Sequence, residues 1–350
     1  MHFGSDNQTG ASSQIMNMIL QANNGYTHGY GEDAWTARAV QAFSETFDCD
    51  LVAYFVATGT AANSLALACL VQPWETVLCH HQAHILIDES TAPEFYSGGA
   101  RLIPISHGAG KLTVEQIDRF FHLAGRDYPH NARPGALSFA QSSELGQVYT
   151  PQEITALCTA AHAEGMAVHM DGARFANAVA ALGCSPAELT WKAGVDVLSL
   201  GATKNGALMA EAVIFFNKDL AAAFAERRKR GGHLVSKGRF FGVQFIAWLE
   251  NGHWLELARH ANQQAARLAE GLVATPGIRL TWPVQANEIF VILPQTTASR
   301  LQAAGATFYE WYLEGLPPHL ALGQEESFIR LVTSFITRDE DITEFLKLLT

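Results

Sequence analysis

A lysine surrounded by small residues is the first feature of this sequence that could do chemistry. Lys204 lies in the segment LGATKNG, residues 200–206, directly after an apolar run. Lysine is almost never buried without a reason, and small neighbours let a backbone or a planar ring approach it closely. The pattern indicates a reactive amine, although a lysine on a surface loop would give the same local sequence.

Asp171 is the second such residue, within the segment HMDGAR at 169–174. A carboxylate at the carboxyl end of a buried strand lies where α/β proteins bind their ligands. An unpaired buried carboxylate is costly, so Asp171 needs a cationic partner. Two partners remain open at this point: Arg174, which would close the turn, or a bound cationic group.

The third feature is the turn TGTAAN, residues 58–63, between an apolar run and a helical pattern. Gly59 and Thr60 stand where the free backbone N–H groups of a helix start can face an anion. The sequence contains neither GxGxxG after its first strand nor GxxxxGK[ST], which argues against the usual dinucleotide and P-loop cradles. Many strand-to-helix turns need glycine for geometry only, so this turn alone is a weak signal.

Together the three features ask for one ligand that carries a phosphate, a cationic ring nitrogen and an aldehyde. Pyridoxal phosphate (PLP) meets that description. In this hypothesis the amides near Gly59 and Thr60 bind the phosphate, Asp171 keeps the ring nitrogen protonated, and Lys204 bonds to the aldehyde. The combination is far more specific than its parts.

Several short motifs also follow one another in a characteristic order. They are SDN near the start, YGED, GTAAN, a lone histidine before an Asp-Glu pair, HMDGAR, GATKNG and FIRLV. In this order the chain resembles, over nearly its whole length, the low-specificity L-threonine aldolases, which include phenylserine aldolases. The resemblance implies a fold type I PLP-dependent enzyme, similar to aspartate aminotransferase. It implies reversible cleavage of L-threonine, L-allo-threonine and related L-β-hydroxy-α-amino acids such as phenylserine to glycine and an aldehyde.

The resemblance also implies roles for individual residues. The implied catalytic residues are Lys204, His84, Asp171 and Asp88. The implied cofactor-binding residues are Gly59, Thr60, His84, Asp171, Arg174 and Lys204, with the His84 imidazole stacked on the PLP ring. The implied substrate-binding residues are Ser5, Tyr30, Arg174 and Arg330, with Tyr30 donated by the neighbouring subunit. The arginines suit this role because a planar guanidinium binds a carboxylate through two parallel hydrogen bonds.

One departure from the family concerns the base. Many members carry Asn-Thr-His after the strand that here ends in Phe139-Ala140-Gln141, and that histidine is proposed to act on the β-hydroxyl. This chain reads QSSE at residues 141–144. The candidates are His84, His130 and a water held by a carboxylate such as Asp88; His84 ranks first because its place in the pattern is clear.

Three alternatives can be weighed against this hypothesis. Another fold type I PLP lyase, either β-eliminating or of the serine hydroxymethyl type, would share Lys204, Asp171 and the arginines. A non-catalytic α/β protein that binds a phosphate ligand would need the phosphate turn but not the lysine. The segment HHQAH at 80–84 suggests a metal, but it does not match HExxH and lacks nearby carboxylate and cysteine partners, so we expect no metal site.

The elements that must position these residues alternate along the chain. We expect strands at 51–56, 76–79, 101–105, 136–140, 166–170, 195–200 and 212–216, with helical patterns between most of them. Strands that are apolar throughout are typical of strands buried on both faces, which predicts an α/β layer with a mostly parallel sheet.

Beyond about residue 235 the pattern changes to a long amphipathic helical region, strands at 288–293 and 328–332, and a final helix capped at Thr337. This grouping suggests a smaller α+β carboxyl-terminal domain. We therefore expect an arm at 1–25, a large PLP-binding domain at 26–235 and a small domain at 236–350.

Composition narrows the class of protein. The 350 residues include 34 acidic and 23 basic side chains, a formal charge of −11, and only 16% charged residues, against ~25% in typical soluble domains. An acidic balance argues against nucleic acid as a partner, and the basic run RRKR at 227–230 reads as a solvated helix end. The arm and the donation of Tyr30 that the resemblance implies predict at least a dimer, either a dimer or a tetramer, and the low charge is consistent with surface buried between subunits.

Cysteines and the amino terminus bear on location. The five cysteines are odd in number, form no CxxC pair and lie mostly in apolar runs, so we expect reduced thiols in a cytoplasmic protein. The start MHFGSDNQTG has neither a charged leader nor an apolar stretch, and no apolar run approaches ~18 residues. We expect neither export nor membrane insertion.

Overall fold

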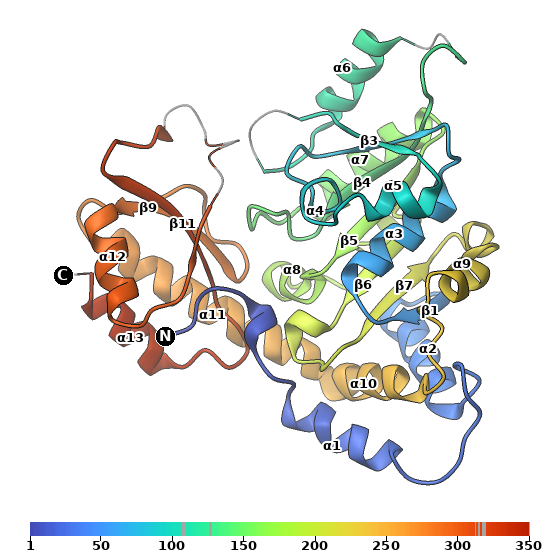
Figure 1. Ribbon diagram of the computed structural model, residues 1–350, viewed down its shortest axis with the longest axis horizontal. Coiled ribbons are helices and arrows are strands. Elements are labelled where there is room, and N and C mark those ends of the chain that lie inside the picture. Colours follow the sequence, from blue (N-terminus) through green and yellow to red (C-terminus); the bar gives the residue numbers. More distant parts are fainter. Residues whose placement is uncertain (107–109, 126–127, 312, 314–315, 317–319, 350) are drawn as a thin grey trace.

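The structure is a computed structural model that describes residues 1–106, 110–125, 128–311, 313, 316 and 320–349. Figure 1 shows a larger unit built around one sheet and a smaller unit beside it, with the long helix α11 (His253–Val273) running between them. The amino terminus lies against the smaller unit.

The larger sheet has seven strands in the order β1-β7-β6-β5-β4-β2-β3. Their bounds are β1 (Val52–Val56), β2 (Thr76–Cys79), β3 (Arg101–Pro104), β4 (Pro134–Ala140), β5 (Ala167–Gly172), β6 (Val197–Gly201) and β7 (Glu211–Phe215). Neighbours from β3 to β6 pair in parallel, and β7 is antiparallel to both β6 and β1. The predicted mostly parallel sheet is confirmed.

Helices cover both faces of this sheet, as its apolar strands require. One face packs against α2 (Ala34–Phe47), α6 (Val114–Ala124), α7 (Pro151–Ala163), α8 (Phe175–Leu182) and α10 (Arg239–Leu249). The other packs against α3 (Gly59–Leu70), α4 (His84–Ile87) and α9 (Phe224–Arg230), while α5 (Ala92–Ser97) lies against α3. Along β6, Leu198 and Leu200 point to the first face and Val197 to the second, so this strand is buried on both sides.

This topology decides where the chemistry can lie. Because β2, β4, β5 and β6 are adjacent and parallel, their carboxyl ends meet at one edge of the sheet. The segments at and after the ends of these four strands carry His84, Glu144, Asp171 and Lys204 in turn. Ligands of open α/β sheets bind outside this edge.

The smaller unit is a four-stranded antiparallel sheet in the order β10-β11-β9-β8 with helices on it. Its elements are β8 (Arg279–Leu280), β9 (Glu288–Pro294), α12 (Gln295–Ala303), β10 (Tyr309–Glu310), β11 (Glu326–Val332) and α13 (Asp339–Lys347). The amino terminus joins it: the Phe3 N–H donates to Thr307 O at 2.8 Å, Phe3 O accepts from the Val332 N–H at 2.9 Å, and the Phe3 ring is buried against Phe345.

From there the chain crosses back to the larger unit. A short 3₁₀ helix η1 (Asp6–Gln8) and α1 (Ser13–Ala22) follow the first residues. The other 3₁₀ turns are η2 (Trp191–Ala193), η3 (Thr203–Asn205), η4 (Lys218–Ala221) and η5 (Glu250–Gly252). η1 therefore places its side chains between the two units.

The carboxyl-terminal half departs from the predicted pattern in two places. The single helical region expected around 245–258 is two helices, α10 and α11, separated at η5, where Asn251 and Gly252 adopt left-handed backbone angles. α10 packs on α1 and α2, within the core of the larger unit. The boundary between the large and small domains at residue 235 stays a prediction. The predicted cap Thr337 is wrong: its hydroxyl accepts the Ser334 N–H at 2.9 Å, and α13 is capped by Arg338, which pairs with Asp341.

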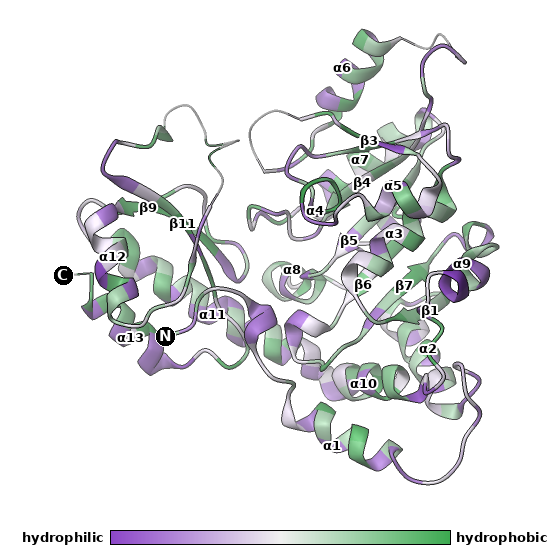
Figure 2. Ribbon diagram, viewed as in Figure 1, coloured by the Kyte–Doolittle hydropathy of each residue, from purple (hydrophilic) through white to green (hydrophobic). Residues whose placement is uncertain are grey.

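Figure 2 shows green, hydrophobic strands through the centre of the larger sheet and a strongly purple α9 at its edge. α9 ends in the basic run 227–230, so these side chains form a helix end, as predicted. Among the described residues, no helix combines the length and apolar character needed to cross a membrane.

Candidate functional site

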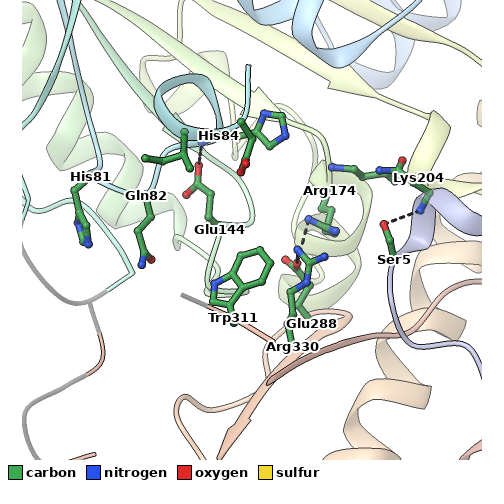
Figure 3. A pocket seen from close by; sticks show the side chains of 13 residues that line it. Ser5, His81, Gln82, His84, Glu144, Arg174, Lys204, Glu288, Trp311 and Arg330 are labelled. Atoms are coloured by element: carbon green, nitrogen blue, oxygen red, sulfur yellow. Dashed lines mark hydrogen bonds and ion pairs between the residues drawn. The ribbon is translucent and has the colours of Figure 1, made fainter. Parts of the chain in front are cut away.

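A cavity of about 560 Å³ opens at the carboxyl edge of the larger sheet, between the two units (Figure 3). It is lined by Ser5, Asn7, His81, Gln82, His84, Ile87, Asp88, Glu144, Arg174, Lys204, Glu288, Trp311 and Arg330. The lining comes from the amino-terminal segment, from the loops after β2, β4, β5 and β6, and from the smaller unit. Residues from the whole length of the chain thus meet at one site.

Asp171 is fixed at the end of β5. Its Oδ1 accepts the Ala173 N–H at 2.9 Å, and its Oδ2 accepts Nδ2 of Asn63 from α3 at 2.8 Å. Burial alone would raise the pKa of Asp171, but the charges of His84 and Lys204 and the Ala173 N–H outweigh it, so the pKa lies below its ordinary value. Asp171 is therefore an ionised carboxylate, able to keep a cationic group protonated.

His169, two residues earlier on the same strand, lies inside the sheet. Its ring nitrogens pair with the hydroxyls of Ser138 and Ser199, each at 2.9 Å, on the neighbouring strands. Burial lowers the pKa of His169 to about 4. His169 is thus a neutral, hydrogen-bonded core residue that supports the strand carrying Asp171.

Lys204 lies in η3, directly after β6, and is half-buried. Within the described residues its amine makes no hydrogen bond or ion pair, while its charge acts on Asp171 and Asp6. Behind it Glu211 bonds to Thr203, and burial raises the pKa of Glu211 to about 7. Lys204 lines the cavity, and Asp171 lies close enough to feel its charge, which suits covalent attachment of a ligand.

The start of α3 offers the predicted anion seat. The Thr58 hydroxyl caps the helix by accepting the Ala61 N–H, and across the described chain the N–H groups of Gly59 and Thr60 have no hydrogen-bond acceptor. A methyl group added to Gly59 would meet nothing within 4 Å, so open space adjoins these N–H groups. One turn along α3, Asn63 contacts Asp171, which ties this seat to the carboxylate.

His84 begins α4 at the opposite side of the cavity. Its Nδ1 lies 2.9 Å from Oε1 of Glu89, a buried carboxylate that also accepts Nδ2 of Asn63 at 2.9 Å. This hydrogen bond to Glu89 raises the pKa of His84, while burial acts in the opposite direction. Asp88 lines the cavity but is exposed, so Glu89, and not Asp88, holds the imidazole.

The two predicted arginines converge on the cavity. Nε and Nη2 of Arg174 donate to the two carboxylate oxygens of Asp6 at 2.8 and 3.0 Å, which leaves Nη1 toward Glu288 at 3.2 Å. Arg330 lies over the ring of Trp311 at 4.2 Å and donates from Nη2 to Gly4 O at 3.3 Å. Its Nε is buried without a hydrogen-bond acceptor among the described residues.

Glu288 lies between these guanidinium groups. Its Oε1 is 3.2 Å from Nη1 of Arg174 and 3.7 Å from Nη1 of Arg330, and its side chain is only 1% exposed. Burial disfavours the charge on Arg174, but Asp6 and Glu288 outweigh it and raise the pKa of Arg174. Two cations and two carboxylates therefore balance at the boundary of the two units.

Glu144 completes the acidic side of the cavity. It follows β4, and its Oε1 accepts the backbone N–H of His84 at 3.1 Å (Figure 3). Burial raises the pKa of Glu144 to about 7, against the backbone hydrogen bonds that lower it. A carboxyl that titrates near neutral pH is suited to move a proton in both directions.

The structure brings most of the predicted site residues together. The cavity lining contains Ser5, His84, Asp88, Arg174, Lys204 and Arg330. Asp171 is outside the lining and is joined through Asn63 to α3, the helix that begins with Gly59 and Thr60. Tyr30 does not reach the cavity of its own chain: it is 52% exposed and its ring lies 5.3 Å from Nζ of Lys229. His130, one of the predicted bases, is exposed and outside the lining.

Sequence reasoning missed four acidic residues of the site: Asp6, Glu89, Glu144 and Glu288. Glu89 and Glu144 carried a signal, because one adjoins the predicted Asp88 and the other ends the segment that departs from the family. Asp6 is the middle residue of the SDN motif, whose aspartate was given no role. Glu288 carried no signal, since its partners lie far away in the sequence. Among the described residues, no group of three or more His, Cys, Asp or Glu side chains is arranged to hold a metal ion.

Comparison with known proteins agrees with this geometry. A protein-family profile described as Beta-eliminating lyase matches residues 2–296. The sequence is 44% identical to a low specificity L-threonine aldolase of Pseudomonas aeruginosa over 313 residues, 89% of this chain and 90% of that protein. A solved Leishmania major threonine aldolase has a TM-score of 0.91 at 28% identity and covers 99% of this chain and 98% of that one.

A more distant likeness concerns the fold alone. A structure of serine palmitoyltransferase with PLP has a TM-score of 0.71 at 18% identity, over 100% of this chain and 86% of that one. Together with the two sheets, these likenesses confirm the predicted fold class, a fold type I PLP-dependent large domain with a smaller α+β domain.

Proposed function

The chain belongs to the beta-eliminating lyase family, and on that premise we propose that it is a PLP-dependent lyase of the low-specificity L-threonine aldolase type. It cleaves L-threonine, L-allo-threonine and related L-β-hydroxy-α-amino acids, phenylserine among them, reversibly to glycine and an aldehyde. The observation that carries this proposal is the cavity that Lys204 lines, with Asp171 behind it and within reach of the Lys204 charge, in a chain 44% identical to a curated aldolase.

Each part of PLP has a counterpart among the residues described. Lys204 supplies the amine that bonds to the aldehyde, Asp171 the carboxylate for the ring nitrogen, and Gly59 and Thr60 the N–H groups for the phosphate. His84 is the imidazole that stacks on the ring, held in place by Glu89. When bound, PLP supplies an electron-accepting ring next to the substrate Cα.

The remaining site residues bind and orient the amino acid. Nη1 of Arg174 and the guanidinium of Arg330, two residues that line the cavity, are positioned to hold its carboxylate, with Ser5 beside them. Asp6 occupies the other two nitrogens of Arg174 and fixes the direction of its guanidinium. A carboxylate held at two points sets which bond of Cα faces the ring, and this orientation selects the bond that breaks.

A direct experiment follows the products. The purified holoenzyme is incubated with L-threonine, and glycine, acetaldehyde, ammonia and 2-oxo acids are measured in the same sample. We expect glycine and acetaldehyde in equal amounts, and we expect a Lys204→Ala variant to lose both the product and the visible absorbance band of the bound cofactor. A variant that kept that band unchanged would contradict the role of Lys204.

The family description favours one rival, a β-eliminating lyase. Elimination needs the same Lys204, Asp171 and arginines, so the site alone does not separate the two reactions. Ammonia and a 2-oxo acid in place of glycine would establish elimination and exclude the aldol cleavage.

A homo-oligomer with shared active sites is the second part of this proposal. An apolar groove lined by Ile19, Leu208, Met209, Val235, Phe240 and Phe241 lies between α1, α10 and the loop after Lys204. Leu208 is 56% exposed and Tyr30 adjoins the groove, since its N–H donates to Ser236 O at 2.9 Å. A second copy on this face would bury the groove and receive Tyr30, in a dimer or a tetramer. The five free cysteines support a cytoplasmic location.

A further inference from the structure

Proton transfer at the substrate β-hydroxyl is the step of the proposed reaction that still lacks a residue. This inference rests on the proposed function. We propose that Glu144 is that catalytic residue: its carboxylate takes the hydroxyl proton during cleavage, and its carboxylic acid returns a proton to the aldehyde oxygen during synthesis.

Glu144 is placed where it can reach the substrate. It follows β4, which lies between the strand that carries Asp171 and the strand that leads to His84. Its side chain lines the cavity, and the His84 N–H holds one carboxylate oxygen at 3.1 Å. Figure 3 shows the Glu144 side chain between His84 and Trp311, with its carboxylate toward His84, and Arg330 lies over the Trp311 ring. A substrate held by the arginines therefore meets Glu144 on its other side.

The acidity of Glu144 suits the same role. Burial raises the pKa of Glu144 to about 7, so both protonation states are present near neutral pH. The titratable groups that face it are His84 on α4, Asp171 on β5, Cys79 at the end of β2, and Tyr149 before α7. Burial raises the pKa of Cys79 to about 12 and also raises that of Tyr149, so both remain neutral while Glu144 titrates.

The other candidate bases are less suited to this step. Nδ1 of His84 is engaged by Glu89 at 2.9 Å, and this bond raises the pKa of His84, so more of the imidazole is already protonated at a given pH and cannot accept the hydroxyl proton. Asp88 is exposed to solvent at the rim, and His130 lies outside the cavity lining. Within the described part of the chain, Glu144 is the shielded carboxyl of this lining that is not committed to an arginine.

The bond changes balance without a further reactant. In cleavage the Glu144 carboxylate bonds to the β-hydroxyl proton, the O–H electron pair becomes the second bond of the aldehyde carbonyl, and the Cα–Cβ bond breaks with its pair left on Cα. In synthesis each change is reversed, and Glu144 loses its proton to the aldehyde oxygen. Nothing is oxidised or reduced by an outside agent.

The test compares the wild-type holoenzyme with Glu144→Gln, because glutamine can still accept the His84 N–H but cannot exchange a proton. We expect kcat for L-threonine cleavage to fall by about 10²–10⁴-fold, the usual worth of a general acid or base. Exchange of the glycine α-proton with deuterium oxide should stay within about threefold, since glycine has no β-hydroxyl. The dissociation constant of PLP should likewise change by no more than about threefold.

An infrared pH titration gives a readout that does not depend on activity. The wild-type protein should show protonated-carboxyl absorbance from Glu144 and Glu211 that disappears with a midpoint near the pKa of about 7 of each group, and Glu144→Gln should lose the part that Glu144 contributes while the Glu211 part remains. The Asp88→Asn variant tests Asp88 as the alternative base. A loss of cleavage in Asp88→Asn with normal cleavage in Glu144→Gln would overturn the assignment to Glu144.

Two further outcomes also decide. If Glu144→Gln loses both glycine exchange and cleavage, Glu144 only supports His84, and the proposal is overturned. A wild-type enzyme that neither cleaves L-threonine nor exchanges glycine would overturn the proposed function, and this inference with it. Loss of cleavage in Glu144→Gln with normal glycine exchange supports both the proposed function and the role of Glu144.

Discussion

Glu288 stands between the two guanidinium groups that the proposed substrate carboxylate would use. The carboxylate is buried, and Oε1 lies 3.2 Å from Arg174 and 3.7 Å from Arg330. A negative charge in this place compensates the arginines before substrate binds but repels a second carboxylate. The residue thus sets how strongly the site attracts its substrate.

We therefore expect Glu288→Gln to lower the KM for L-threonine by about fivefold, with a smaller change in kcat, because about 1 kcal/mol of repulsion is removed. The matched control is Glu326→Gln, which removes a half-buried carboxylate at the other end of the same pair of strands, next to Arg279. Steady-state kinetics of the two variants check this. A KM that rises in Glu288→Gln would show that the carboxylate is needed to position the arginines instead.

At the scale of residues, the sequence was informative where one residue type has few uses. Lys204, Asp171 and His84 stand out by their motifs; Lys204 and His84 line one cavity, and Asp171 lies behind it under the influence of both charges. Glu288 could not be recognised, and Asp6 was part of a motif without a role, because both carboxylates act on Arg174, which only folding brings near. Glu89, the partner of His84, was missed for a related reason: which of two adjacent carboxylates faces inward depends on how α4 ends.

At the scale of elements, glycine substitutions can distinguish the binding role of the start of α3 from the packing role of the end of β6. A Cβ added at Gly59 would lie in open space, whereas a Cβ at Gly201 would lie 2.9 Å from Cα of Ala173 and 3.1 Å from its O. The Gly59→Ala substitution therefore extends a helix start without a clash, but its methyl group enters the space beside the free N–H groups.

We expect Gly59→Ala to leave the melting temperature of the cofactor-free protein unchanged or slightly higher, and to raise the dissociation constant of PLP by about tenfold, the equivalent of a lost charge-assisted contact. Gly201→Ala should instead destabilise the fold by about 1–3 kcal/mol, because backbone must move. Thermal melts and absorbance titrations with PLP distinguish the two. Unchanged PLP affinity in Gly59→Ala would contradict the phosphate seat at α3.

Strand β5 makes a second prediction at this scale, through His169. Its pKa in the folded protein is lowered to about 4 by burial, while an unfolded histidine titrates near ~6.5. Between these values the unfolded chain binds a proton that the folded chain does not, so stability falls as the pH falls. From pH 7.5 to pH 5 we expect a loss of about 2 kcal/mol from this residue.

Melting temperatures measured across this pH range test the expectation. His169→Gln should be less stable than the wild type at pH 7.5, because a buried bridge between two strands is altered, but its melting temperature should depend less on pH. His28→Gln, which changes an exposed histidine, should follow the wild-type pH dependence. An unaltered pH dependence in His169→Gln would show that another group is responsible.

Most strands of the larger sheet could be predicted because strands buried on both faces consist mainly of apolar residues. The strands β1 to β7 are mostly apolar, and the capping box of α7 joins Thr150 to Glu153 as its sequence indicates. The break between α10 and α11 could not be predicted from periodicity, since apolar residues continue at helical spacing across it and the change of direction is made by two left-handed residues at η5. The short α4 has too few residues to show a period, yet it carries His84.

At the scale of the whole molecule, the site is assembled from parts that lie at opposite ends of the chain. Ser5 and Asp6 come from the amino terminus, Arg330 from the last strand, and Lys204 from the centre. The first residues reach the cavity because Phe3 is bonded into the smaller sheet. Any motion of one unit against the other would therefore change the distance between the arginines and Lys204.

The role predicted for Tyr30 requires a second copy of the chain, because Tyr30 would serve the site of the neighbouring subunit. Tyr30 lies on the outer face of its own subunit, beside the apolar groove and away from the cavity. If it serves the neighbouring site, two inactive variants should complement each other. Tyr30→Ala damages the site of the partner, and Lys204→Ala damages the site of its own chain.

Mixing the two variants by co-expression should then restore activity. In a mixed dimer one site carries both substitutions and the other carries neither, so an equal mixture should recover roughly one quarter of the wild-type activity, since half of the dimers are mixed and each has one intact site. If Tyr30 acted within its own chain, both sites of the mixed dimer would carry one lesion and no activity would return. Light scattering of the mixture confirms that dimers or larger assemblies are present. An absence of complementation in such assemblies would contradict the shared site.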